Sequence, residues 1–103
     1  MFHLIDTTGL IAGRSYTLAV PGSGVPAIFI ANEAATTQVD LILLSMHGDV
    51  RIKFDGTDPT STEGNFFTTG DFVIIRGSDA ILRARILGTN GSTGVDAQPF
   101  LKE

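Results

Sequence analysis

The sequence predicts an all-β fold, a single β-sandwich of about eight strands with jelly-roll or Ig-like topology, over residues 1–103. Twelve glycines and four prolines interrupt the chain at short intervals, as they do where turns join short strands. The segments between them are rich in Val, Ile, Phe and Thr, which suit a pleated, half-buried surface. Several segments alternate apolar and polar residues, which is the period of a strand.

The composition limits the classes of function. Hydrophobic residues make up 43% of the chain and charged residues 17%, below the roughly 25% typical of soluble domains. We therefore expect a dense core together with apolar surface that is buried against a partner. The net charge of −4 argues against a nucleic-acid partner, which usually requires a basic face. The absence of cysteine excludes disulfides and thiolate metal sites.

Neither a membrane span nor a signal peptide is predicted. No apolar run approaches the roughly 18 residues that a spanning helix needs. The first residues lack the basic start and apolar middle of a secretory signal. We expect no membrane partner, and we expect the protein to be made and kept in the cytoplasm until it assembles.

The N-terminal part of the chain contains three predicted strands. Residues 2–5 are a short apolar start typical of an edge strand, and residues 15–20 alternate with Tyr16 on the same face as the apolar positions. Pro and Gly end that strand. Residues 27–31 form the next apolar run, and residues 32–37 are predicted to be a loop because their threonines disfavour a helix.

Residues 38–46 form a nearly continuous apolar run. A helix would need polar positions at helical spacing, so a strand covered on both faces fits better. One face lies on the core, and the other needs separate cover. Another subunit could provide it, or a loop or the N-terminal segment of the same chain. The predicted subunit contact comprises the apolar residues of this strand, namely Val39, Leu41, Ile42, Leu43 and Leu44.

The middle of the chain continues this pattern. Residues 47–49 are a compact turn, which predicts a hairpin between residues 38–46 and the strand 50–54. Arg51 and Lys53 face outward from the second strand. Its inward residues are Val50, Ile52 and Phe54.

Three segments complete the predicted sandwich. Residues 71–76 form a strand, residues 77–79 turn the chain, and residues 80–87 form a further strand. Residues 95–101 close the fold at an edge or strand end, since Pro99 cannot donate to a ladder. In the strand 80–87 the alternation predicts Leu82, Ala84 and Ile86 inward and Arg83 and Arg85 outward.

The turn-rich connection after residue 54 is the first candidate site. Its carboxylates, a Gly and hydroxyls could hold Ca²⁺, although the spacing and the bidentate Glu of an EF-hand are missing. Turn chemistry explains the same residues: a tight turn at its start, a carboxylate cap before the proline, and a capping box from Thr60 to Glu63 for one helical turn. We favour this interpretation and predict no metal. The turn motif comprises Asp55, Gly56, Thr57, Asp58, Pro59 and Thr60.

No catalytic constellation is visible. His3 and His47 are the only histidines, and no serine sits in a nucleophile elbow. No glycine-rich phosphate loop follows a strand. We therefore predict no catalytic residue and no cofactor, and we do not expect an enzyme.

Basic and aromatic side chains offer two weaker candidates. Arg51, Lys53, Arg83 and Arg85 could line one sheet face and bind an anionic partner, although pairing with acids of the same chain is favoured. The pair at residues 66–67 could stack on sugars or dock into a partner. More often such a pair folds back to seal the end of a sandwich.

The segment from residue 50 to residue 71, VRIKFDGTDPTSTEGNFFTTGD, resembles small structural proteins of tailed bacteriophages and prophages. In these a strand of the type V-R-x-x-x-D-G-T-D-P-T precedes T-x-G, an apolar pair, a Gly-Asp turn and a strand, and a later strand carries R-x-R. The resemblance covers the C-terminal half best. Its matching residues are Val50, Arg51, Asp55 through Thr60, Thr62, Gly64, Phe66, Phe67, Gly70, Asp71, Arg83 and Arg85.

This resemblance implies a non-enzymatic component of the virion, such as a head decoration protein, a head-fibre module or a tail accessory protein. Its partners would be copies of itself, as a dimer or trimer, and capsid or tail subunits. It would be made in the host cytoplasm and reside in the virion. A similar turn also occurs in Ig-like accessory domains of carbohydrate-active enzymes, whose Tyr-rich strand this sequence lacks. A carbohydrate-binding or Ig-like accessory module is therefore the alternative.

Overall fold

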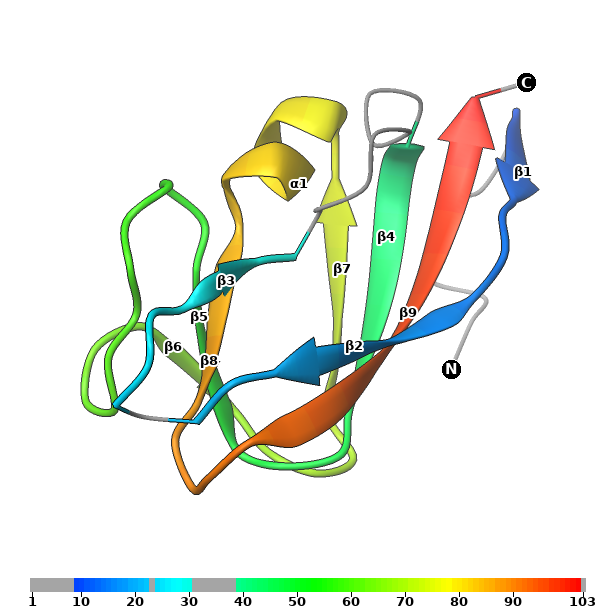
Figure 1. Cartoon of the computed structure of the whole chain (residues 1–103). Helices are drawn as coiled ribbons and strands as arrows, with labels where there is room; N and C mark the ends of the chain where they lie inside the picture. Colours follow the sequence, from blue (N-terminus) through cyan, green and yellow to red (C-terminus); the bar gives the residue numbers. More distant parts are fainter. Residues whose placement is uncertain (1–8, 23, 31–38, 103) are drawn as a thin grey trace.

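Two antiparallel sheets pack face to face in the computed structural model, which describes residues 9–22, 24–30 and 39–102 (Figure 1). This confirms the predicted all-β sandwich. The described elements are β1 (Leu10–Ala12), β2 (Tyr16–Val20), β3 (Ile28–Phe29), β4 (Val39–Met46), β5 (Val50–Lys53), β6 (Asn65–Phe67), β7 (Phe72–Arg76), α1 (Ser78–Arg83), β8 (Arg85–Gly88) and β9 (Thr93–Lys102).

Strand β9 is the centre of the five-stranded sheet. That sheet has the order β1-β9-β4-β7, and β2 also pairs with β9, beyond β1 along the same side. The four-stranded sheet has the order β3-β8-β5-β6. Figure 1 shows β9 running the length of its sheet from the tight turn after β8 to the C-terminus.

The central position of β9 corrects the prediction that residues 95–101 form an edge. Pro99 lies opposite the interruption between β1 and β2, where Gly13 donates its N–H to the Pro99 carbonyl at 2.9 Å. A proline is tolerated in a central strand only where a ladder bond is not needed. The break in the neighbouring strand supplies such a place, and the sequence of β9 alone does not reveal it.

The core lies between the two sheets and is filled by the side chains that alternate strand residues direct inward. In β2 and β5, the residues predicted to lie on the apolar face are buried except at one end of each segment. The buried residues are Leu18, Val20, Val50 and Ile52. Tyr16 is partly buried and packs against the core. The larger fully buried side chains include Ile30, Ile42, Leu44, Met46, Ile81, Ile86 and Val95.

The predicted strand over residues 80–87 is wrong in its first half, which belongs to α1. Gly77 precedes the helix with a φ of 89°, Asp79 lies in its first turn and Arg83 in its last. Charges in these positions complement the helix dipole. Ile81 is buried and Leu82 is exposed, so the buried positions follow helical spacing to Ala84. Among the described residues no helix is long and apolar enough to cross a membrane.

The predicted hairpin at residues 47–49 is also wrong, because β4 and β5 belong to different sheets. The segment carries the chain across the sandwich instead. Phe54 lies beyond the end of β5 and is 36% exposed, so it is not a core residue. Strand β7 confirms the strand predicted for residues 71–76.

Two predictions fall outside the described residues. The apolar start at residues 2–5 and the loop at residues 32–37 lie there. Of the apolar run 27–31, the structure describes residues 27–30, and only Ile28–Phe29 form a strand.

Candidate interaction surfaces

Strand β4 buries residues on both of its faces, as predicted. Val39, Ile42 and Leu44 belong to the core between the sheets. Leu41 and Leu43 point to the other side of the sheet, which we call the outer face of the five-stranded sheet. A register shift between Val39 and Leu41 explains why Val39 does not share their side. Of the five predicted contact residues, only these two lie on the outer face.

Apolar side chains continue across this outer face onto the neighbouring strands. Leu41 lies opposite Phe100 on β9, and Leu43 lies opposite Ile74 on β7. Directly opposite residues share one face of an antiparallel pair. Leu41 and Leu43 are 0% and 9% exposed, whereas Phe72 at the start of β7 is 48% exposed. The outer face therefore presents apolar surface on the β7 side.

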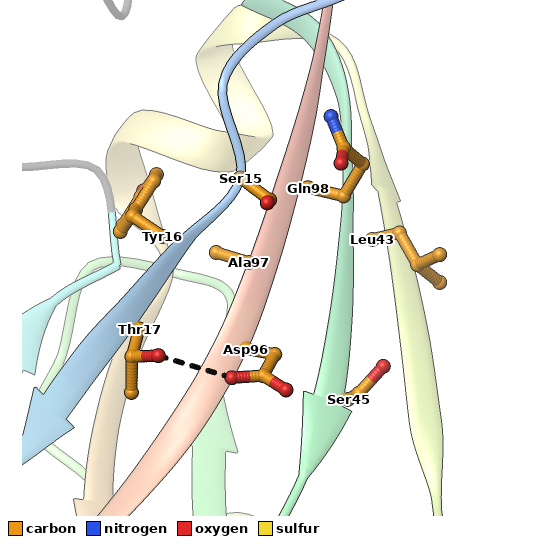
Figure 2. Close-up of a pocket in the computed structure, with 8 residues that line it drawn as sticks. All are labelled: Ser15, Tyr16, Thr17, Leu43, Ser45, Asp96, Ala97 and Gln98. Atoms are coloured by element: carbon orange, nitrogen blue, oxygen red, sulfur yellow. Dashed lines mark hydrogen bonds between the residues drawn. The ribbon is translucent and has the colours of Figure 1, made fainter.

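The β2 side of the same face is polar and hollowed. A shallow groove of about 370 Å³ crosses β2, β9 and β4 (Figure 2). Its hydroxyl, amide and carboxylate groups can donate and accept hydrogen bonds. The side chains that give the groove this character are Ser15, Thr17, Ser45, Asp96 and Gln98, and the apolar Leu43 lines it beside them.

Asp96 is the charged residue of this groove. It accepts a hydrogen bond from the Thr17 hydroxyl at 3.1 Å, and its other oxygen lies 2.8 Å from His47 Nε2. The His47 contact, followed by the Thr17 bond, lowers the pKa of the Asp96 carboxyl below its ordinary value. His47 is exposed, as predicted for a turn residue, but its pairing with Asp96 was not predicted, because 49 positions separate the two in the chain.

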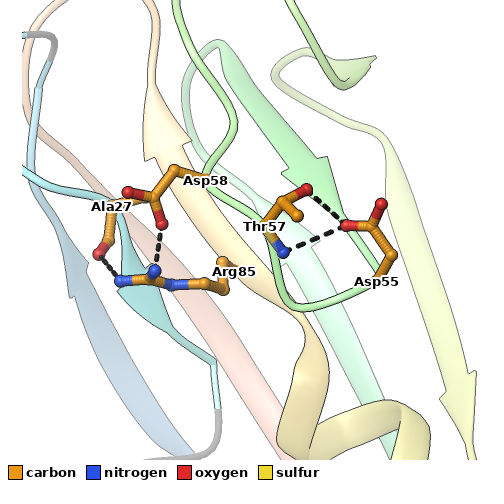
Figure 3. A network of polar contacts seen from close by, with 5 residues as sticks. All are labelled: Ala27, Asp55, Thr57, Asp58 and Arg85. Carbon is orange, nitrogen blue, oxygen red and sulfur yellow. Dashed lines mark hydrogen bonds and ion pairs between the residues drawn. The ribbon is translucent and has the colours of Figure 1, made fainter.

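The predicted turn motif forms two successive turns. Thr57 donates its backbone N–H to Asp55 Oδ1 at 3.0 Å, and its hydroxyl binds the same oxygen (Figure 3). These bonds, the hydroxyl first, lower the pKa of the Asp55 carboxyl. Gly56 takes a φ of 89°, which a residue with a side chain rarely adopts. The tight turn predicted at Asp55 and Gly56 is confirmed.

The second turn follows Pro59. Thr60 Oγ1 accepts the backbone N–H groups of Thr62 and Glu63 at 3.2 and 3.0 Å. The Thr60 N–H in turn binds the carbonyl of Glu63 at 3.0 Å. The side chain therefore caps the backbone as a capping box would, but no helical turn forms here.

Asp58 binds the loop between β5 and β6 (residues 54–64) to the four-stranded sheet. It does not cap the backbone before Pro59, as was predicted. Its carboxylate forms an ion pair with Arg85 of β8 (Figure 3). The same guanidinium donates to the Ala27 carbonyl at 2.6 Å and lies 4.3 Å from the centre of the Phe29 ring. Arg85 thus joins the loop, β8 and β3.

Arg51 fastens the other end of the loop. Its Nε donates to the Ser61 carbonyl at 3.1 Å and its Nη1 to the Gly64 carbonyl at 2.8 Å. The guanidinium lies 5.2 Å from the centre of the Phe66 ring. A Cβ at Gly64 would lie 3.2 Å from the Cβ atoms of Arg51 and Pro59. The loop therefore packs closely over the outer face of the four-stranded sheet.

These contacts decide how the basic side chains are used. Arg85 and Lys53 lie opposite each other on β8 and β5, so part of the predicted basic stripe exists. Both arginines of this stripe, Arg51 and Arg85, are held by the loop, whereas Arg83 lies on α1. We favoured pairing of these basic side chains with acids of the same chain, and Arg85 forms such a pair with Asp58.

The Phe pair of β6 divides between the two sides of its strand. Phe67 packs against the core, while Phe66 is 50% exposed beside Arg51. In the described part of the chain, no three His, Asp or Glu side chains gather as a metal site requires.

Comparisons with known proteins give no relative for this chain. A scan against protein-family models found no match, and searches of curated proteins and of solved structures found none either.

Proposed function

We propose that this protein is a non-enzymatic structural component of a phage or prophage virion, a head decoration or tail accessory protein that self-associates and binds capsid or tail subunits. The observation that carries the proposal is the apolar part of the outer face of the five-stranded sheet. Phe72 is half exposed there beside Leu43 and Ile74. Aromatic side chains of this kind supply the buried centre of protein interfaces.

The segment that resembles phage structural proteins supports the proposal from the other sheet. Its loop is tied to β5 and β8 through Arg51, Arg85 and Asp58. These polar groups hold the loop in place, so the residues of the motif serve to stabilise one loop conformation. A virion component needs such stability, because it has to keep one shape in an assembled particle.

The test is whether the protein is part of a virion. Particles released from the source strain after prophage induction are purified on a density gradient, and the protein is quantified by mass spectrometry across the fractions. We expect it to follow the major capsid or tail protein at a fixed ratio. Gold-labelled antibody should then mark heads or tails in electron micrographs. Recovery only at the top of the gradient would contradict the proposal.

A carbohydrate-binding module is the second candidate, and the polar groove favours it. Hydroxyl, amide and carboxylate groups line an open hollow across β2, β9 and β4, and such groups can bind sugar hydroxyls. A glycan array tests this with wild-type protein and the variants Asp96→Ala and Phe66→Ala. Saturable binding lost in Asp96→Ala would place the sugar in the groove, and binding lost in Phe66→Ala would place it on the four-stranded sheet. An array without signal removes this candidate.

A further inference from the structure

One row of side chains crosses the outer face of the five-stranded sheet from its aromatic side to its charged side. Ser45 of β4 lies opposite Phe72 of β7 on one side and opposite Asp96 of β9 on the other. Asp96 in turn lies opposite Thr17 of β2. Neighbouring strands are about 4.8 Å apart, so two strand spacings, about 10 Å, separate Phe72 from Asp96. The residue between them, Ser45, has a short side chain and lines the polar groove (Figure 2).

The polar groups of this groove that have a fixed role are hydrogen-bond acceptors. Gln98 Nε2 donates to the carbonyls of Gly13 and Pro99 at 2.7 and 3.1 Å, which leaves its Oε1 to bind a ligand. The Thr17 hydroxyl donates its hydrogen to Asp96. Asp96 accepts one bond on each oxygen, whereas a carboxylate has about four lone-pair sites. A ligand that fits the groove therefore has to bring donors.

The charge of the groove is negative. Asp96 is the charged residue that lines it, and two hydrogen bonds to the carboxylate favour the ionised form. The ion-pair partner of Asp96 among the described residues is His47, which carries a charge only when it is protonated. Neutral His47 donates a hydrogen bond and leaves the negative charge in place. None of the described residues that line the groove is a lysine or an arginine.

Apolar surface lies beside these acceptors. Leu43 lines the groove two residues before Ser45 on β4, and it lies opposite Gln98 on β9. Phe72 is 48% exposed at the far end of the row. An arginine side chain packs its stem along apolar surface while its charged group reaches a polar partner. The groove and its aromatic neighbour offer both kinds of contact within the length of one row.

We propose that this groove binds an arginine side chain of a partner polypeptide. The guanidinium binds the Asp96 carboxylate and the Gln98 Oε1. The stem crosses Ser45 beside Leu43, so the partner backbone lies on the side of Phe72. Arginine fits better than lysine, since its planar fork of donors can form two parallel bonds with a carboxylate. A neutral sugar brings no charge that complements the carboxylate.

The proposal rests on the proposed function, and it names the chemistry of the contact: the capsid or tail subunit presents an arginine with apolar neighbours to this face. Asp96 is 55% exposed, and an ion pair at an exposed site is weak by itself. We therefore expect an isolated arginine to bind with a dissociation constant of about a millimolar or weaker. A partner that also covers Phe72 should bind more tightly.

The experiment compares two probes that differ in charge. Nα-acetyl-arginine methylamide is titrated into isotope-labelled protein, and its matched control is the citrulline analogue, in which a neutral urea replaces the guanidinium. The titrations are followed by amide NMR at low ionic strength and about pH 8, where histidine side chains are ordinarily neutral. We expect saturable shifts in β2, β4 and β9 with arginine, and about three- to fivefold weaker binding of citrulline. Added salt should weaken the arginine response alone.

Two variants test the groove in different ways. Asp96→Asn removes the charge, so arginine should then bind no better than citrulline. Ser45→Leu keeps that charge and fills the space for the stem, so binding should be lost. The control is Asp79→Asn, the same charge change at an exposed position of α1, which should leave binding unchanged. The amide spectrum of each variant shows whether it is folded.

Several results would overturn the arginine site. These are an absence of saturable shifts, equal binding of the two probes, shifts outside the groove, and arginine binding that both groove variants retain. Methyl glucoside is titrated as well. Shifts of the groove amides by this sugar, without a response to arginine, would assign the groove to carbohydrate instead.

Particle association of the Asp96→Asn variant, measured on the density gradient, separates this proposal from the proposed function. We expect the variant to lose both arginine binding and its place on the particles. A wild-type protein that follows particles without binding arginine would reject the groove contact and keep the virion role. Arginine binding by a protein that is absent from particles would do the reverse.

Discussion

The outer faces of the two sheets differ in how they are covered. On the four-stranded sheet, the chain returns over its own strands. Arg51 and Arg85 hold the returning loop through Gly64 and Asp58, and Arg85 also binds the Ala27 carbonyl ahead of β3. On the five-stranded sheet, Phe72 is half exposed and an open polar groove crosses the strands.

This difference shows that the two outer faces of one small sandwich can be suited to different roles. Charged side chains bind the loop to the sheet. Their hydrogen bonds satisfy polar groups of a segment that has little regular structure. The five-stranded sheet leaves an aromatic side chain and a polar groove open on its outer face, and both can contact another molecule. The predictions below test each side of this contrast.

The largest effect is expected within β4, where neighbouring residues face opposite sides. Ile42→Asp places a carboxylate in the core, where Ile42 is 2% exposed, and should cost more than about 4 kcal/mol of unfolding free energy. Leu43→Asp lies at the groove, where water can reach the carboxylate. It should cost about 1–2 kcal/mol. Urea denaturation measures both, and equal costs would mean that the outer face is as closed as the core.

Release of the loop is expected to be the next largest effect. Arg85→Ala removes the ion pair with Asp58, the bond to the Ala27 carbonyl and the contact with the Phe29 ring. Since the Arg85 side chain is only 20% exposed, the loss should be about 2–3 kcal/mol. Arg83→Ala, on an exposed helix position, should change stability by less than about 0.5 kcal/mol. Proteolysis of the loop should accelerate in the first variant only.

Two glycine substitutions test how closely the loop packs on the sheet. Gly64 and Gly70 both have positive φ, at 119° and 93°, and alanine in that region costs about 1 kcal/mol. A Cβ at Gly64 also meets Arg51 and Pro59, whereas one at Gly70 meets nothing within 4 Å. We expect Gly64→Ala to cost about 2 kcal/mol and Gly70→Ala about 1 kcal/mol by thermal unfolding. Equal costs would show that the loop shifts away from Arg51 and makes room for the added methyl group.

The smallest effect concerns the groove and depends on pH. The pKa of Asp96 is lowered from 3.8 by His47 and Thr17, so the folded state favours the charged carboxylate. Its contribution to stability is present above the unfolded pKa and is lost as pH falls through the lowered folded pKa. The stability difference between wild type and Asp96→Asn should therefore disappear in strong acid.

Thr17→Val provides the control for this titration. It removes one of the two bonds to the carboxylate, so the Asp96 pKa should rise toward its ordinary value while His47 still holds the other oxygen. Carbon-detected NMR of the carboxyl groups measures the shift. An unchanged Asp96 pKa would mean that Thr17 does not bind the carboxylate in solution.

The sequence predicted the elements whose burial follows the strand period. Residues of β2 and β5 alternate, β7 is a short apolar run, and the structure has strands at all three places. The run over residues 82–86 also alternates, yet α1 reaches Arg83. Ile81 and Ala84, three positions apart and both buried, together with Asp79 ahead of them, were the helical signal. A short helix joined to a short strand produces a pattern that alternation alone misassigns.

The contacts of the candidate surfaces could not be predicted in the same way. Asp58 meets Arg85 and Asp96 meets His47 only because the fold brings segments together that are far apart in the chain. Local turn chemistry did predict the Asp55 turn, since its bonds span two residues. The two faces of β4 were predicted, but the register shift that sends Val39 to the core is a tertiary feature.

The central position of β9 has a consequence for how the chain folds during synthesis. β9 pairs with β1, β2 and β4, and its register joins Leu10 to Lys102 and Val20 to Thr93. Of the described strands, the one synthesised last is therefore the one on which β1, β2 and β4 assemble. The five-stranded sheet cannot form until β9 has been synthesised, and its non-local pairing favours slow folding, on a scale of about milliseconds to seconds. Until β9 has been synthesised, β1 and β2 lack their pairing partner and β4 has only β7. Chaperone dependence during expression should be concentrated in this interval.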